Sequence, residues 1–150
     1  MTSRIAVTTV TVFLLDFISK ALVRQMMPFE SSLPVIRGVL YLTHVGNPGA
    51  AFGLLANQTG FFVAVTLAVV GLILYYARQV KDAGSLMHVS LGLQLGGALG
   101  NLLDRLRFGR VTDFVDFRVW PVFNLADSAI VIGVALFFWL MWRQVAAENE

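Results

Sequence analysis

The sequence predicts a mainly α-helical integral membrane protein, with four transmembrane helices and a small extramembrane β-cradle in one membrane domain over residues 1–150. The first observation is composition: 57% of the residues are hydrophobic and 13% are charged, which is too apolar for a soluble domain of this size. The second is that four segments reach the roughly 17 to 25 mostly apolar residues that a spanning helix needs. The third is that strand-like patterns occur only between those segments.

The four apolar segments predict helices over about residues 5–23, 61–77, 86–103 and 123–142. The first begins like a signal peptide, with Arg4 ahead of an apolar run. Asp16 and Lys20 interrupt that run and no convincing cleavage site follows, so we expect a retained helix. An even number of spans places both termini on one side of the membrane. The distribution of Lys and Arg leaves the orientation undecided, because most of those on the richer side have acids nearby.

The segment 25–60, between the first two helices, is expected to lie outside the membrane. It contains three prolines and two strand-like runs, at 39–45 and 50–55, which predict a small sheet or cradle. The connection after the second helix is short and polar, which predicts a plain turn on the opposite side.

The third helix carries small and polar residues on defined faces. A Gly-x-x-x-Gly-x-x-x-Gly pattern begins at Gly92, and it predicts a strip where a neighbouring backbone can approach closely. Ordinary helix packing is the simplest interpretation of that strip. Gly97, Asn101 and Arg105 recur every fourth residue, so an amide and a guanidinium face one side of the helix as it leaves the membrane.

Acidic residues near the last helix suggest a catalytic pair. Asp127 lies close to the start of the fourth apolar segment, where a carboxylate is a functional hypothesis by default. The strand-like segment 110–120 alternates, so Asp113 and Asp116 point to opposite faces and one of them can join Asp127. Two carboxylates that share a proton can run aspartic proteolysis, one activating water while the other polarises the scissile carbonyl. The alternation alone permits either strand acid, and each could instead be a solvated charge paired with a nearby Arg.

The remaining candidate site residues could have structural roles instead of functional ones. Asn124, followed three residues later by Asp127, resembles a reciprocal helix cap. Asp16 and Lys20 lie four residues apart on the first helix, where they could form a structural ion pair or order a site. Asn47 begins an Asn-Pro-Gly sequence, which is itself a strong turn signal.

Several chemistries are excluded. The chain has no cysteine, so no thiolate nucleophile or thiolate metal site is possible. His44 and His88 are its only histidines and no His-Glu-x-x-His signature exists, which argues against a zinc protease. No phosphate loop or dinucleotide fingerprint occurs, and the net charge of +2 comes from dispersed residues without a basic block. We therefore expect neither a zinc-protease site nor a nucleic-acid partner.

Five motifs, taken in order, resemble those of bacterial lipoprotein signal peptidases, also called signal peptidase II. They are Asp16-x-x-Ser19-Lys20, Asn47-x-Gly49-Ala50-Ala51-Phe52, Gly96-Gly97-Ala98-x-Gly100-Asn101-x-x-Asp104-Arg105, Val111-x-Asp113-Phe114 and Phe123-Asn124-x-Ala126-Asp127. Each motif alone is weakly specific, whereas five in this order together with four spans are highly specific. The resemblance covers about residues 12–133, with Gly46 and Pro48 around Asn47 as minor departures.

The resemblance implies an aspartic endopeptidase of the bacterial inner membrane that lies in membrane lipid, with cytoplasmic termini and a site near the outer leaflet. Its substrates would be prolipoproteins, cut just before a cysteine that carries diacylglycerol. The motifs make Asp113 and Asp127 the catalytic dyad. They give supporting or substrate-positioning roles to Asn47, Asn101, Arg105, Asn124, Asp16 and Lys20. A monomer without metal or cofactor is expected.

Two other classes of protein remain as alternatives. A small transporter or channel could use Asp16, Lys20 and Asp127 as an ion path, and a scaffold could assemble through the glycine face. Transport ordinarily favours internal repeats or broken helices, and the sequence has no sign of either. Either alternative predicts no cleavage of a lipidated substrate. A scaffold also predicts that Asp127→Asn is tolerated while Gly96→Leu is not.

Overall fold

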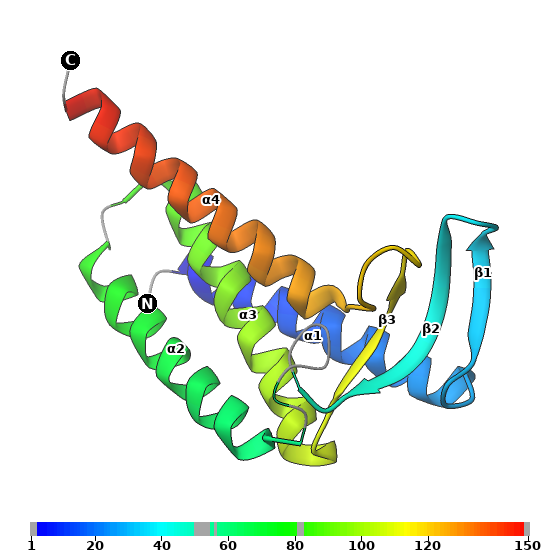
Figure 1. Ribbon diagram of the computed structural model, residues 1–150. Coiled ribbons are helices and arrows are strands. Elements are labelled where there is room, and N and C mark those ends of the chain that lie inside the picture. Colours follow the sequence, from blue (N-terminus) through cyan, green and yellow to red (C-terminus); the bar gives the residue numbers. More distant parts are fainter. Residues whose placement is uncertain (1–2, 50–54, 56, 81–82, 149–150) are drawn as a thin grey trace.

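The computed structural model describes residues 3–49, 55, 57–80 and 83–148. These residues form four long helices and a three-stranded sheet (Figure 1). The elements in chain order are α1 (Ser3–Met26), β1 (Ser32–Ile36), β2 (Leu40–Asn47), α2 (Thr59–Gln79), α3 (Ser85–Phe108), β3 (Val111–Asp116) and α4 (Leu125–Glu148). The predicted fold class is confirmed, because all four helices are long and apolar enough to cross a membrane.

The helices extend beyond the apolar cores from which they were predicted, because polar residues continue the helical hydrogen bonding past the hydrophobic run. The exception is the start of α4, which begins at Leu125 although its apolar run begins at Phe123. Phe123 instead pairs with Val115 of β3 in an isolated antiparallel bridge. The chain is therefore extended at Phe123 and becomes helical at Leu125. This late start of α4 places Asp127 in its first turn.

Helix α3 is the centre of the bundle. In its apolar 18-residue stretch, 67% of the residues are buried inside the protein, against 22% or less in the corresponding stretches of the other helices. A Cβ added at Gly96 would lie 2.8 Å from the backbone oxygen of Thr9 on α1, and one added at Gly97 would collide with the carbonyl group of Ala126 on α4. The glycines thus permit the close helix approach that the sequence predicts.

The sheet is antiparallel throughout, in the order β1-β2-β3. The predicted strand at 39–45 corresponds to β2, whereas the run predicted at 50–55 falls almost entirely outside the described residues. Strand β1 was missed because all five of its residues are exposed, so it shows no alternation. A register shift in β2 between Leu42 and Val45 places Asp113 of β3 opposite Val45.

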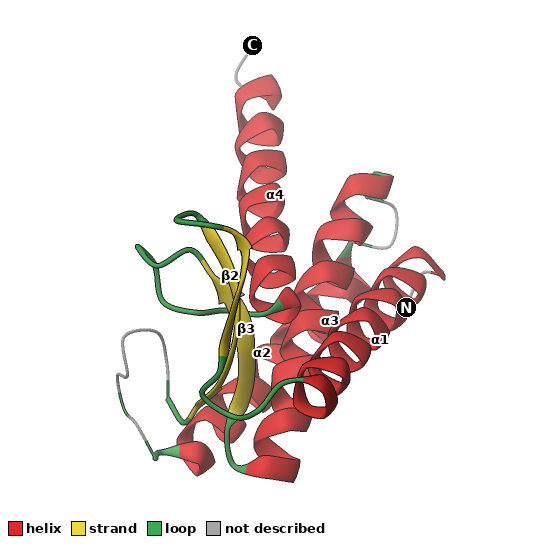
Figure 2. Cartoon of the chain, turned by 90° about the vertical axis from the view of Figure 1, so that its right-hand side faces the viewer, coloured by secondary structure: helices red, strands yellow, loops and turns green. Residues whose placement is uncertain are grey.

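The sheet lies at the end of the bundle where α1 ends and α4 begins (Figure 1), and Figure 2 looks at the molecule from that side. Both termini and the connection between α2 and α3 lie toward the other end (Figure 1). Polar residues from the second halves of α1 and α3 and the first turn of α4 therefore come together beside β3.

Candidate active site

Asp113 lies within β3 with only 2% of its surface exposed. Asn47 on β2 donates its side-chain N–H to Oδ2 at 3.1 Å, and Asn124 donates to Oδ1 at 2.6 Å. Burial and the neighbouring Asp127 carboxylate raise the pKa of Asp113 to about 7, although these two amides oppose the shift. This carboxyl group therefore keeps its proton at pH values where an ordinary aspartate is ionised.

Asp127 lies in the first turn of α4 and has two roles in the structure. Its Oδ2 accepts the backbone N–H of Asn124 at 3.3 Å, while its own N–H donates to Oδ1 of Asn124 at 2.9 Å. This is the reciprocal helix cap that the spacing suggested. Its Oδ1 accepts a hydrogen bond from Asn101 on α3 at 2.7 Å. Capping and a place in the site are therefore compatible.

Asp16 and Lys20 on α1 contact the helices that carry Asn101 and Asp127. Both are at most 1% exposed, and Lys20 Nζ lies 2.7 Å from Asp16 Oδ2. Lys20 also donates to Oδ1 of Asn101 at 2.9 Å, and Asp16 accepts the backbone N–H of Ala126 at 2.9 Å. The pair is thus an ion pair that also binds α3 and α4.

A cavity of about 250 Å³ opens onto both acids. Among the residues that line it are five predicted site residues: Asn47, Asn101, Arg105, Asp113 and Asp127. Arg105 donates to the carbonyl oxygen of Gly49 at 3.3 Å, and its guanidinium carbon lies 5.0 Å from the centre of the Phe62 ring. The aromatic face and the carbonyl group thus hold the cation at the cavity wall.

The structure separates the two strand acids. Asp116 points away from the cavity and accepts hydrogen bonds from the Thr43 hydroxyl at 2.7 Å and the Arg118 backbone N–H at 2.8 Å. Burial works to raise the pKa of Asp116, but the Thr43 and Arg118 hydrogen bonds and the Arg118 charge outweigh it and leave the pKa below its usual value. Asp113 is therefore the strand acid that faces the Asp127 side.

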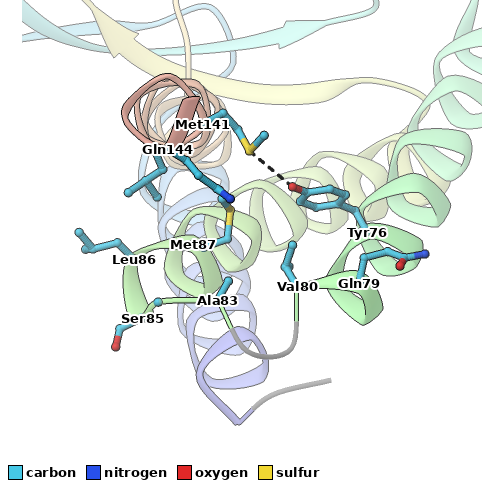
Figure 3. Close-up of a pocket in the computed structure, with 11 residues that line it drawn as sticks. Tyr76, Gln79, Val80, Ala83, Ser85, Leu86, Met87, Met141 and Gln144 are labelled. Atoms are coloured by element: carbon cyan, nitrogen blue, oxygen red, sulfur yellow. Dashed lines mark hydrogen bonds between the residues drawn. The ribbon is translucent and has the colours of Figure 1, made fainter. Parts of the chain in front are cut away.

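A larger cavity lies elsewhere. It has a volume of about 710 Å³ and lies between the α2–α3 connection and the second half of α4 (Figure 3). Tyr76 and Gln144 are among its polar lining residues, and Tyr76 donates to the sulfur of Met141 at 3.5 Å. None of the described residues that line it is acidic. Chemistry rather than size therefore identifies the smaller cavity as the candidate active site.

The two histidines belong to neither cavity. His44 Nδ1 is hydrogen-bonded to the Met27 carbonyl oxygen, and His88 Nε2 to that of Val80, each at 2.9 Å. Within the described part of the chain, no group of three or more His, Cys, Asp or Glu residues is arranged to hold a metal ion.

A model of the family described as signal peptidase (SPase) II matches residues 8–143. The chain belongs to the signal peptidase II family. Members of this family are aspartic endopeptidases that cleave the signal peptides of prolipoproteins, and this is the activity of the present chain. The predicted family, fold class and reaction are confirmed, and the transporter and scaffold alternatives are not supported.

Individual relatives agree with the family match. A lipoprotein signal peptidase of Moorella thermoacetica is 55% identical over 128 residues, which cover 85% of each chain. One of Halothermothrix orenii is 48% identical over 133 residues, or 89% of this chain and 91% of the relative. A solved bacterial membrane enzyme at 2.3 Å resolution superposes with a TM-score of 0.88 at 32% identity, over 97% of this chain and 92% of the other. The chain is thus a multi-pass membrane protein of bacteria.

Signal peptidase II motifs that are far apart in the sequence meet in one hydrogen-bonded cluster. All eight predicted site residues are in contact with this cluster or its cavity. Sequence reasoning missed Phe62, which holds Arg105, and the part of the cavity wall formed by Trp120 and Val131. These are common apolar residues in an apolar chain, so no sequence signal distinguishes them.

Proposed function

We propose that Asp113 and Asp127 are the catalytic dyad and that the scissile bond precedes a diacylglyceryl-modified cysteine of the prolipoprotein. The observation that carries this proposal is the position of Asn124. Its side chain donates to Asp113 and its backbone N–H donates to Asp127, so one residue orients a carboxyl group of each. Both acids line the same cavity.

The chemistry needs one proton shared between the two acids. The ionised carboxylate takes a proton from a water molecule, whose oxygen attacks the scissile carbonyl carbon, while the protonated carboxyl group donates its proton to the carbonyl oxygen. The tetrahedral intermediate, a geminal diol, then collapses as the C–N bond breaks. The acid that took the water proton gives it to the leaving amine, and the other acid regains its proton from a diol hydroxyl as the new carboxyl group forms. The raised pKa of Asp113, caused by burial and by Asp127, favours Asp113 as the resting place of the shared proton. The apparent pKa values belong to the pair as a whole.

The other polar residues would hold the substrate or the dyad. Arg105 presents a planar fork of N–H donors at the cavity wall, which suits the backbone carbonyl groups of an extended substrate. Asn47 and Asn101 each donate to one acid, and Lys20 fixes Asn101 in the orientation that makes this possible. Asp16 holds the start of α4 through Ala126.

The same proposal covers the setting of the enzyme. The chain would act as a monomer and single domain in the lipid of the bacterial inner membrane, with cytoplasmic termini and the dyad near the outer leaflet. The position of the sheet and dyad at one end of the bundle, with both termini toward the other, supports this orientation. A site at the membrane boundary would allow the substrate's acyl chains to remain in lipid during cleavage. No metal, cofactor or nucleic acid enters the proposed reaction.

The test is cleavage of a diacylglyceryl-modified prolipoprotein by purified protein in detergent or lipid. Asp113→Asn and Asp127→Asn should each lower kcat at least about 100-fold, because an amide cannot exchange the required proton. Asp116→Asn is the matched control: it removes a buried acid from the same strand, one that points away from the cavity, and should leave kcat within about threefold. An inactive Asp116→Asn beside an active Asp113→Asn would show that the dyad is wrongly assigned, provided that both variants fold.

A further inference from the structure

A second buried polar cluster lies directly behind β3. Asp104 on α3 is 3% exposed, and both of its carboxylate oxygens lie within 3.3 Å of Nη1 of Arg24 on α1. Asp104 Oδ2 also accepts the backbone N–H of Thr112 at 2.9 Å, and the same Arg24 nitrogen donates to the Thr112 hydroxyl at 2.8 Å. The ring of Phe108 lies 4.7 Å below the guanidinium carbon and limits its orientation. We call Arg24, Asp104 and Thr112 the β3 clamp.

The β3 clamp takes no direct part in the reaction proposed above. None of its three residues lines the cavity that holds the two acids, so none of them contacts substrate there. An ion pair inside membrane-spanning helices is costly to bury, and a well-packed apolar substitute is often as stable. Helix association alone therefore does not account for it.

The geometry connects the β3 clamp to the dyad. Thr112 immediately precedes Asp113, and Asp104 holds its backbone N–H while Arg24 holds its hydroxyl. Asp104 lies one turn after Asn101 on α3, and Asn101 binds Asp127. The same two turns of α3 thus hold Asp127 through Asn101 and the start of β3 through Asp104.

We propose that Arg24 and Asp104 are positioning residues that set the Asp113 carboxyl group against Asp127 by fixing Thr112. This inference rests on the proposed dyad and extends it to residues that do not contact the substrate. A positioning role predicts slower turnover with normal substrate binding, because the cavity and Arg105 remain in place while the reacting groups are misaligned.

The experiment compares kcat and KM for a diacylglyceryl-modified prolipoprotein, using full-length protein in detergent with the folded fraction of each variant measured. Thr112→Val replaces one hydroxyl by a methyl group and should lower kcat about tenfold, with KM within about twofold of wild type. Asp104→Asn and Arg24→Met should do the same, and Arg24→Lys should recover most of the loss. The matched control is Arg118→Met, which removes an ion pair with Asp116 at the opposite end of β3 from Thr112 and should leave kcat unchanged.

The outcomes separate the two proposals. Wild-type kcat per folded molecule in the three clamp variants, with only a lower Tm, would overturn the positioning role and leave the dyad intact. So would a rise in KM at constant kcat. If Asp104→Asn fails to fold, Thr112→Val and Arg24→Met decide. Cleavage by Asp113→Asn at the wild-type rate would instead overturn the proposed dyad, and this inference with it.

Discussion

At the scale of single residues, the candidate site holds a carboxyl group in an environment that disfavours its charge. Asp113 is almost fully buried and faces another acid, so folding favours its neutral form. The two amides that bind it reduce this preference without removing it. A group poised to keep its proton near neutral pH suits acid–base chemistry, and the same property should lower the stability of the protein as pH rises.

This predicts a pH-dependent effect of Asp113→Asn on stability. The pKa of Asp113 is about 7 in the folded state, against 3.8 for an ordinary, solvated aspartate. A raised folded-state pKa means that the stabilising effect of the bound proton is complete below about pH 4 and is lost as pH rises through about 7. Asn cannot ionise, so the Tm of Asp113→Asn relative to wild type should increase by several degrees between pH 5 and pH 8. Thermal unfolding in detergent at these two pH values measures it.

Asp116→Asn provides the control for this measurement. Its hydrogen bonds and ion pair hold the pKa of Asp116 below the usual value despite burial, so its stabilising charge is lost only as pH falls below about 4. The Tm difference between Asp116→Asn and wild type should therefore be the same at pH 5 and pH 8. A similar constant difference for Asp113→Asn would contradict the raised pKa.

At the scale of elements, helix α3 sets the geometry of the site through its glycines. Gly96 packs against α1, and Gly97 packs against the backbone of Ala126 at the start of α4. Ala126 immediately precedes Asp127, so the distance between α3 and α4 fixes the position of that carboxylate. The packing of this pair of helices is thus part of the proposed catalytic arrangement.

Gly97→Ala should therefore impair catalysis. The new methyl group would collide with the Ala126 carbonyl and lie 2.8 Å from Ile130, so the start of α4 has to move. We expect kcat to fall about 100-fold, together with a lower Tm, since a displacement of about 1 Å can have an effect of that size. Gly71→Ala on α2 is the matched control, because an added Cβ there meets no atom within 4 Å. Full activity of Gly97→Ala would show that α4 tolerates the shift.

Elements also mark the limit of what the sequence predicts. Composition and the lengths of the apolar segments predict the four helices, because a segment long and apolar enough to span lipid can be recognised from its own residues alone. The choice between Asp113 and Asp116 depends on how β3 pairs with β2 and on the bridge from Val115 to Phe123, which join segments far apart in the chain. Local alternation cannot specify such pairing, so only the family resemblance selected Asp113. Local sequence patterns likewise do not predict the ion pair between Arg24 and Asp104.

At the scale of the whole molecule, the polar interior and the apolar exterior reverse the pattern of a soluble protein. Helix α1 shows this most clearly. One of its faces carries Asp16, Lys20 and Arg24, which bind α4, α3 and β3 respectively. Other positions on α1, such as Leu15 and Leu22, expose large apolar side chains that lipid can cover. One charged stripe on α1 therefore contacts three of the elements that carry the site.

The proposed orientation of the molecule can be tested because the natural chain contains no cysteine. Val119 lies at the sheet end and is 91% exposed, whereas Ser85 is exposed at the α2–α3 connection toward the other end. With the site near the outer leaflet, a membrane-impermeant maleimide should label Val119→Cys in intact spheroplasts. It should label Ser85→Cys only after permeabilisation, and wild type not at all. Cleavage activity of both variants confirms that they are folded. The reverse labelling pattern would place the dyad on the cytoplasmic side, where a substrate's lipid-modified cysteine on the outer surface could not reach it.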